Sequence, residues 1–387
     1  MPTATSVMQP ALPSHAQVVP DGVAESGPLP VALLGIPFDP LTIADTVDRV
    51  ETMIAARRPH FVVTANVDFL IQARRDADLR QALYLADYVL CDGTPVLWAS
   101  RWFGNSLPGR TAGSDLVPEL IRRAAEKNWK IFLLGGADGV AEEAARRVAE
   151  LHPSLPPIAF YSPPFRPLHE MNHPDIAERI QTAKPDILLV SFGCPKQEKW
   201  IALHYRTLGV PVCMGVGATI DFLAGRVRRA PAWMRRTGTE WMFRLIQEPR
   251  RLYRRYCDDF IHFFPALWFS RRHYRPRRGD SARAGLPPQS TPTAYGLHIQ
   301  VGEALDRPAL RQAFRIWERT IESKGHCLVD LSRVVHLDST GLAFLATWQK
   351  RLAAHRRNLV LYRPSGAVRS ALEAQDLTRH FVITEGP

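Results

Sequence analysis

Between residues 60 and 215, short apolar runs alternate with stretches of helical pattern, and this alternation constrains the fold more than any other feature. Each run ends in a polar or glycine-containing turn, as the strands of an open parallel sheet do at their ligand-binding edge. We therefore expect an α/β protein whose Rossmann-like parallel sheet carries helices on both faces. The predicted strands cover 60–64, 88–91, 130–134, 186–191 and 210–215, and the predicted helices cover 68–85, 114–128, 140–151, 175–183 and 197–208.

Asp92 is the strongest candidate for a catalytic residue. It follows the predicted strand 88–91 and precedes Gly93, whose backbone can approach a ligand closely. This placement puts a carboxylate at the carboxyl edge of the sheet, where it could take a proton from an acceptor hydroxyl. The alternative is that Asp92 caps the helix that follows.

Three further polar residues stand at the ends of predicted elements. Thr64 and Asn66 close one strand and open the next helix, so they either bind substrate or cap the helix, and capping is the better interpretation for them alone. Arg110 precedes the helix predicted from residue 114, a position suited to an anionic group such as a diphosphate. An arginine in a loop is more often only solvated.

Glycines recur where predicted strands join helices, and they leave backbone N–H groups free to bind phosphate. Gly135 and Gly136 form one such turn, and Gly217 belongs with Asp221 to another. Gln197, at the end of a third strand, could hydrogen-bond a sugar or a base. The turn around Gly135 is not GxGxxG, and no GxxxxGKS/T occurs, so neither a dehydrogenase nor a P-loop nucleotidase is indicated.

The order of these clusters resembles the WecG/TagA/CpsF family of bacterial glycosyltransferases, from about residue 31 to residue 256. The segment 229–256, which begins RAPAWMRRTGTEW, is similar to the C-terminal signature of that family. The resemblance implies transfer of a sugar from a UDP-sugar to a polyprenyl-diphosphate-linked glycan, with inversion at the anomeric carbon. Such a transfer is a step in the synthesis of a cell-surface polysaccharide, either an exopolysaccharide, an antigen or a wall polymer. The family varies its sugars on one set of motifs, so the resemblance names neither the donor sugar nor the acceptor glycan.

The resemblance also assigns roles to single residues. Asp92 matches the general base of the family, Thr64 and Asn66 its active-site pair, Arg110 its diphosphate-binding arginine, and Gln197 its substrate-contacting glutamine. These roles suit an inverting transfer, which needs a proton acceptor at the attacking hydroxyl and a positive group near the departing phosphates.

The resemblance implies neither a cofactor nor a divalent metal ion. The only DxD triplet, Asp76-Ala77-Asp78, lies within the predicted helix 68–85 rather than after a strand. We therefore expect it on a solvated helix face. Arg110, the amides of the glycine turns and a helix N-terminus would then stabilise the departing diphosphate.

The formal net charge of +11 favours a polyanionic partner. Ten arginines lie between residues 226 and 255, interleaved with tryptophan and other large apolar residues, which is typical of a segment in a membrane interface. We expect the tail 226–270 to bind an anionic membrane surface, and an ordinary helix packed on the sheet is the alternative. Nucleic acid is not expected, because the charge is confined to one tail without a nucleic-acid-binding motif. The arginines expected at the membrane or the lipid diphosphate are Arg229, Arg235, Arg236, Arg244 and Arg251.

Cysteine usage and hydropathy indicate a cytoplasmic protein. The five cysteines form no CxxC pair, which argues against a zinc site and a disulfide framework. No apolar run approaches the roughly 20 residues of a membrane-spanning helix, and no signal peptide is recognisable. We expect peripheral attachment to the inner face of the cell membrane.

Four segments are predicted from composition. Residues 1–30 resemble a disordered leader, and 31–270 form the transferase-like domain with its basic tail. Residues 271–293 have the composition of a linker, and 294–387 have the pattern of a separate small α/β domain.

This last domain resembles the STAS fold of anti-sigma-factor antagonists and sulfate-transporter tails, over about residues 294–383. The similarity rests on 327–345, which contains Asp338-Ser339-Thr340-Gly341. In that family a partner kinase phosphorylates the second hydroxyl residue, which here is Thr340, and the alternative role of these side chains is a helix cap. The resemblance implies a protein partner for regulation or recruitment. A nucleotide-sugar-binding scaffold that acts through this domain is the alternative to an enzyme, and the intact set of site residues argues against it.

Overall fold

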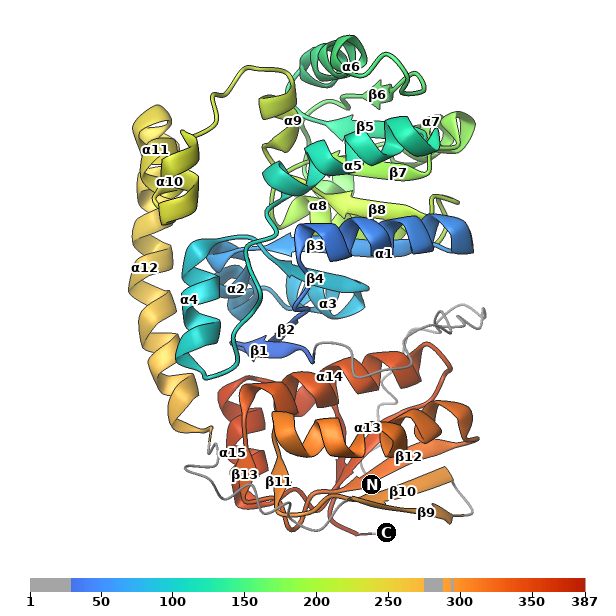
Figure 1. The fold of residues 1–387 in the computed structure, drawn as a ribbon, viewed down its shortest axis with the longest axis vertical. Coiled ribbons are helices and arrows are strands. Elements are labelled where there is room, and N and C mark those ends of the chain that lie inside the picture. The colour runs from blue at the N-terminus through green and yellow to red at the C-terminus, as the bar shows by residue number, and fades with distance from the viewer. Residues whose placement is uncertain (1–28, 275–287, 294–295, 387) are drawn as a thin grey trace, which may run out of the picture.

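The computed structural model describes residues 29–274, 288–293 and 296–386 (Figure 1). Two domains are stacked along the long axis of the molecule, and helix α12 (Pro249–Arg272) runs beside both of them. The first domain contains a six-stranded sheet and the second a five-stranded sheet. Most of the predicted leader and most of the predicted linker lie outside the described residues.

The larger sheet is parallel throughout, with the strand order β4-β3-β8-β7-β5-β6, which confirms the predicted fold class. Strand β6 was not predicted from the sequence, because this edge strand has only three residues and is too short to show a period. The strands are β3 (His60–Ala65), β4 (Tyr88–Cys91), β5 (Ile131–Gly135), β6 (Ala159–Tyr161), β7 (Ile187–Ser191) and β8 (Val212–Gly215).

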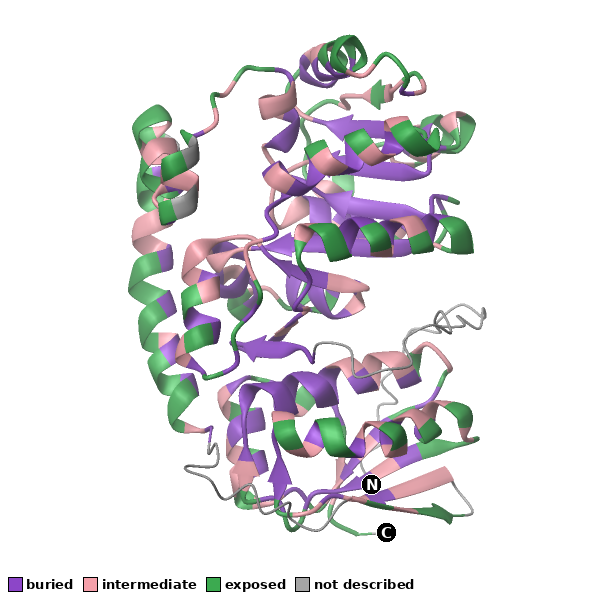
Figure 2. Cartoon of the chain, in the orientation of Figure 1, coloured by how far each residue is buried: buried purple, intermediate pink, exposed green. Residues whose placement is uncertain are grey.

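Helices cover both faces of this sheet, because alternate residues of each strand point to opposite sides. In β5, Ile131 and Leu133 join a core with α1 (Ile43–Ala56), α5 (Gly113–Lys127) and α6 (Val140–Leu151). Phe132 and Leu134 join the core on the other face. Figure 2 shows the strands between these layers as mostly buried. The helices of the second core are α2 (Val67–Arg75), α3 (Ala77–Leu85), α4 (Thr94–Trp102), α7 (His173–Ala183) and α8 (Lys196–His204).

The predicted helix 68–85 is two helices, because Asp76 ends α2 and caps α3. Its carboxylate accepts hydrogen bonds from the backbone N–H groups of Asp78 (3.1 Å) and Leu79 (3.0 Å). Lys199 Nζ lies 2.7 Å from the same carboxylate. The expectation of a solvated helix face therefore holds for Asp78, which is 84% exposed at its side chain, and is wrong for Asp76.

The basic tail folds into α10 (Ala232–Thr237), α11 (Glu240–Gln247) and α12. Helix α12 packs against α2 and, at its far end, against α15 (Gly366–Ala374) of the second domain. Phe263 and Leu267 on one side of α12 are buried. No helix in the described part of the chain combines the length and the hydropathy that a membrane span requires.

The second domain is the predicted small α/β unit. Its sheet has the order β15-β14-β12-β10-β9 and is parallel except for β9 (Gln289–Thr293), which pairs antiparallel with β10. Strand β9 falls inside the interval for which we expected a linker. The other elements are β10 (Gly296–Gln300), β11 (Ala304–Leu305), α13 (Arg307–Glu322), β12 (His326–Asp330), β13 (His336–Leu337), α14 (Ser339–Ala353), β14 (Leu359–Tyr362), α15 and β15 (Val382–Thr384).

A hairpin of β1 (Val31–Leu33) and β2 (Ile36–Phe38) lies between the two domains (Figure 1). It packs against α14 of the second domain and against α4 and β4 of the first. Its side chains belong to one contiguous core that includes residues of both domains. The sequence analysis missed this hairpin, because two strands of three residues are too short to show a period.

Gly341 gives a test of the packing inside the second domain. It lies in the first turn of α14, where a Cβ atom would clash with the carbonyl oxygen of Leu305. Alanine usually stabilises a helix interior relative to glycine by up to about 1 kcal/mol. Here Gly341→Ala should instead lower the free energy of unfolding by about 1–3 kcal/mol, as overpacking does. Gly366→Ala, at the start of α15 with open space around it, is the control and should leave that free energy unchanged or slightly higher. Urea unfolding followed by circular dichroism measures both, and a G341A variant as stable as the wild type would contradict this packing.

Candidate active site

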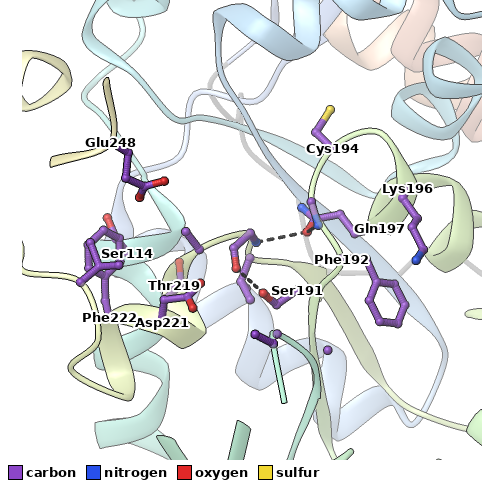
Figure 3. Close-up of a pocket in the computed structure, with 18 of the residues that line it drawn as sticks. Ser114, Ser191, Phe192, Cys194, Lys196, Gln197, Thr219, Asp221, Phe222 and Glu248 are labelled. Atoms are coloured by element: carbon purple, nitrogen blue, oxygen red, sulfur yellow. Dashed lines mark hydrogen bonds between the residues drawn. The ribbon is translucent and has the colours of Figure 1, made fainter. Parts of the chain in front are cut away.

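A cavity of about 950 Å³ lies where the parallel strands of the larger sheet end. Its walls come from the segments that follow β3 to β8 and from the α11–α12 part of the tail (Figure 3). Because parallel strands present their carboxyl ends at one edge, side chains that are far apart in the sequence meet here. The predicted site residues that line the cavity are Thr64, Asn66, Asp92, Gly135, Gly136, Gln197, Gly217, Asp221 and Arg244.

Asp92 enters the cavity directly after β4. Its backbone N–H donates to the carbonyl oxygen of Ala65 (2.9 Å), which holds the ends of β4 and β3 together. Burial raises the pKa of Asp92, while the positive charges of Arg244 and Arg110 act in the opposite direction. A carboxylate with a raised pKa is a stronger base.

Thr64 and Asn66 occupy the end of β3 and the start of α2. The Asn66 side-chain oxygen accepts a hydrogen bond from the backbone N–H of Asp68 (3.0 Å), so the helix-capping role is realised. Both side chains also line the cavity. A residue at this junction can therefore cap the helix and still face the cavity, so helix capping and substrate binding do not exclude each other.

Gln197 connects the turns that follow β7 and β8. Its side-chain oxygen accepts hydrogen bonds from the backbone N–H groups of Gly193 (3.1 Å) and Gly217 (3.2 Å). The Ser191 hydroxyl donates to the carbonyl oxygen of Gly217 (2.6 Å), which adds a second link between the same turns (Figure 3). Gln197 is buried, and its side-chain oxygen is already used in joining the two turns that form the cavity floor.

Gly135 allows the turn after β5 to approach the turn after β7. Its φ is +99°, and a Cβ atom would lie 2.6 Å from the carbonyl oxygen of Ser191. The N–H of Gly136 donates to that same oxygen (3.0 Å). A side chain at residue 135 would push the two turns apart, so glycine is required for the close contact.

Arg110 lies beside the cavity and is held by two carboxylates. Its guanidinium donates to Asp115 (2.5 Å) and to Glu240 of the tail (2.6 Å). Arg244, which lines the cavity, lies 3.3 Å from Glu240. Neither partner of Arg110 was predicted from the sequence: Asp115 lies only five residues further along the chain, whereas Glu240 lies 130 residues away and is brought near by the fold.

Three of the five arginines expected at the membrane or the lipid diphosphate contact a carboxylate of the sheet domain or line its cavity. Arg229 bonds Asp115, Arg235 lies 3.3 Å from the same carboxylate, and Arg244 reaches the cavity. Although burial raises the pKa of Asp115, the hydrogen bond from Arg229 and the charges of the surrounding arginines keep it below its usual value. The side chains of Arg236 and Arg251 lie outside the described part of the structure.

Helix α12 contributes cavity residues that the sequence analysis assigned to the membrane interface. Leu252, Arg255 and Tyr256 line the cavity, and Arg255 Nε lies 3.4 Å from Asp68. The spacing of the residues on this side of α12 is that of one face of a helix. The buried or half-buried positions recur at intervals of three and four along α12 and just beyond it: Leu252, Tyr256, Asp259, Phe263, Leu267, Ser270 and Tyr274.

The motif of the second domain forms a helix cap. Asp338 accepts a hydrogen bond from the N–H of Gly341 (2.8 Å), as the capping alternative expects. Thr340 is fully buried, and its hydroxyl makes no hydrogen bond within the described residues. A kinase could not reach this hydroxyl in the arrangement that the structure adopts.

The described residues contain no cluster of three or more His, Cys, Asp or Glu side chains that could hold a metal ion. Asp76 and Asp78 interact with Lys199 at the α2–α3 break, away from the residues that line the cavity. Metal independence stays a prediction.

Two family models match the chain. The model described as glycosyl transferase WecG/TagA/CpsF family matches residues 31–277, and the model described as Mlab, STAS domain matches residues 295–384. The chain is also similar to N-acetylglucosaminyldiphosphoundecaprenol N-acetyl-beta-D-mannosaminyltransferase from Staphylococcus aureus strains MW2 and MRSA252. Each is 30% identical over 227 residues, which cover 57% of this chain and 86% of the relative.

Glu198 lies beneath the cavity floor and gives a test of its electrostatics. It is fully buried and accepts a hydrogen bond from the Gln197 amide (2.7 Å). Burial raises its pKa from 4.5 to about 8, although the hydrogen bond from Gln197 opposes this rise. The native state therefore keeps a proton that the unfolded chain releases, and the free energy of unfolding should fall as pH rises from 4.5 to about 8.

Glu198→Gln should remove this dependence, because the amide has the same shape and no proton to lose. The stability of the variant relative to the wild type should rise across the interval and stay constant above it. Urea unfolding at a series of pH values measures the difference, with Glu142→Gln at an exposed position of α6 as the control. A difference that does not vary with pH would show that Glu198 is ionised in the folded protein.

Proposed function

The chain belongs to the WecG/TagA/CpsF family of glycosyltransferases, and from this premise we propose that it transfers a sugar from a UDP-sugar to a polyprenyl-diphosphate-linked glycan. The printed name of the staphylococcal relatives describes transfer to such an acceptor, N-acetylglucosaminyldiphosphoundecaprenol. We extend the class of acceptor to this chain, in the synthesis of a cell-surface polysaccharide. The observation that carries the proposal is Asp92 in a large cavity at the sheet edge, with arginines around it.

Asp92 would act as the general base of an inverting, single-displacement reaction. Its carboxylate takes the proton of an acceptor hydroxyl while the oxygen attacks the anomeric carbon of the donor sugar. The bond from that carbon to the UDP oxygen breaks, and UDP leaves with the bonding electrons. The raised pKa of Asp92 favours this proton transfer.

Positive charge beside the cavity would stabilise the departing UDP without a metal ion. Arg110, Arg229, Arg235 and Arg244 share two carboxylates, Asp115 and Glu240, so the network carries an excess of positive charge. Arg244 already lines the cavity, and Arg110 could exchange Glu240 for a phosphate oxygen.

Helix α12 supports a peripheral position at the inner face of the cell membrane. Outside its buried stripe it exposes large apolar side chains, which would cost free energy in water and gain it in a lipid interface. An acceptor carried by a polyprenyl lipid makes such a position useful. The exposed side chains are Phe260 (68%), Ile261 (63%), Phe264 (46%), Trp268 (55%) and Phe269 (54%). A protein partner of the STAS domain belongs to the proposal as well.

Replacing Asp92 by asparagine should reduce the rate of UDP release by about 10²–10⁴-fold, the usual contribution of a general base. UDP binding, measured by calorimetry, should change little because the amide keeps the shape of the side chain. The assay uses a panel of UDP-sugars with a synthetic polyprenyl-diphosphate acceptor. Acceptor-dependent UDP release by the wild type separates an enzyme from a nucleotide-sugar-binding scaffold.

Asp78→Asn makes the same chemical change at an exposed position and should leave the rate unchanged. An Asp92→Asn variant with wild-type turnover would remove Asp92 as the base. Equal losses in UDP binding and turnover would instead assign Asp92 to donor binding.

Phe260→Ser with Ile261→Ser should weaken binding to anionic phosphatidylglycerol vesicles at least about tenfold, because each buried apolar side chain contributes about 1.5–3 kcal/mol. Both residues are exposed in the structure, so the fold should persist. Vesicle cosedimentation measures the change. Leu151→Ser with Phe165→Ser, at exposed positions of the sheet domain, is the matched control. Unchanged binding by the α12 variant would remove this face as the membrane contact.

A further inference from the structure

The two domains of this chain meet in a buried interface that no feature of the transferase reaction requires. Strands β1 and β2 insert their apolar side chains between α14 of the second domain and α4 of the first. Leu33, Ile36 and Phe38 are completely buried there. A Cβ atom at Gly35, in the tip of the hairpin, would lie within clash distance of the Gln375 carbonyl oxygen, so the backbones are in close contact.

Polar side chains inside this interface have partners in the opposite domain. Asn105, which follows α4, donates from Nδ2 to Asp338 (3.0 Å) and to the Ser339 hydroxyl (2.9 Å), and all three residues are buried. Arg80 donates to the carbonyl oxygens of Gln375 and Asp376, both at 3.1 Å. Separation of the domains would replace these hydrogen bonds by hydrogen bonds to water and expose the apolar side chains of β1 and β2, and the second effect favours a persistent contact.

Lys350 adds a charged contact of the same kind. It extends from α14 into the first domain and donates to the carbonyl oxygen of Ala86. The carboxylates of Asp39 and Asp87 lie near enough to favour its charged form, although burial lowers the pKa of Lys350. Separation of the two domains would break this hydrogen bond and move the ammonium group of Lys350 away from both carboxylates.

The second domain also holds the C-terminal end of α12. The Gln375 side-chain amide donates to the hydroxyl of Ser270, and both residues are buried. Tyr274, just beyond α12, packs edge-on against Phe103 with ring centroids 5.3 Å apart. Pro265 lies within α12 and removes one intrahelical hydrogen bond. The last turns of α12 therefore depend on packing from outside the helix.

The other end of α12 forms a wall of the cavity through Leu252, Arg255 and Tyr256. The same helix thus joins the second domain to the substrate site. A second connection runs through Asn105, which lies in the loop after α4, the helix that begins two residues after Asp92.

We propose that the STAS domain docks on the transferase domain of its own chain and acts as a positioning module, which fixes α12 so that its N-terminal turns complete the cavity wall. The proposal rests on the proposed function only in taking the cavity as the substrate-binding site, since the docking of the two domains is a property of the fold. Its partner is the surface of β1, β2, Arg80, Asn105 and Ser270. The expected kinetic consequence of loosening is a higher KM for the lipid acceptor with a much smaller change in kcat, because the wall binds substrate and Asp92 stays in place.

The test uses the full chain with Asn105→Asp, measured by hydrogen–deuterium exchange at pH 8. The new carboxylate faces Asp338, and like charges in a buried site should force the two domains apart. Backbone exchange should become faster along α12, including residues 252–256 at the cavity. Asn172→Asp makes the same change at the exposed cap of α7 and should leave α12 exchange as in the wild type.

Gln375→Ala is the second variant, in case Asn105→Asp unfolds the protein. It removes the hydrogen bond to Ser270 together with the buried end of the Gln375 side chain, and it should raise exchange in α12 without affecting the larger sheet. Faster exchange at 252–256 in either folded variant, with the KM increase, supports the positioning role. Unchanged exchange at 252–256 in Gln375→Ala and in a folded Asn105→Asp overturns it. A wild type that releases no UDP while α12 exchange responds to these variants would count against the proposed function alone.

Discussion

The approach of the β5 and β7 turns is the contact on which the rest of the cavity depends. Gly135 has no side chain, so Gly136 can donate to the Ser191 carbonyl oxygen at 3.0 Å, and Ser191 in turn bonds Gly217 of the β8 turn. Gln197 closes the same set from below. Three strand ends are thereby fixed relative to one another by a backbone hydrogen bond and by the side chains of Ser191 and Gln197. The proposed catalytic side chains, Asp92 among them, surround these three turns. The turns cannot move apart without breaking several hydrogen bonds.

The tail and the sheet domain share one charge network, and this sharing explains why arginines of the tail contact protein rather than solvent. Glu240 of α11 binds Arg110, and Asp115 of α5 binds arginines from the segment before α11. Guanidinium groups outnumber carboxylates in this network, so it remains attractive to an anionic ligand after its internal pairs have formed. A diphosphate would find cations that are already positioned, and it would compete with Glu240 for them.

The order of strands and helices could be predicted from the sequence where the apolar runs were long. The prediction failed where an element is stabilised by residues that are distant in the sequence. The strands buried on both faces are recognisable as continuous apolar runs, and these are β3, β4, β5, β7 and β8. The short β1–β2 hairpin is stabilised by α14, which lies some 300 residues further along the chain. Thr64, Asn66, Asp92 and Gln197 were placed at the cavity because strand ends of a parallel sheet share one edge. The contact of Arg110 with Glu240 could not be foreseen, because the two residues lie 130 positions apart and no local pattern links them.

Helix α12 lines the cavity with its N-terminal turns, through Leu252, Arg255 and Tyr256, and exposes large apolar side chains further along, from Phe260 to Phe269. With these side chains in a membrane interface, as proposed, the cavity wall begins about 6 Å along the helix axis from the lipid contact, at about 1.5 Å per residue from Phe260 to Tyr256. A glycan attached to a membrane-bound diphosphate would then meet the cavity close to the lipid surface. A short acceptor would suffice to reach Asp92, because the helix that contacts the lipid also forms part of the cavity wall.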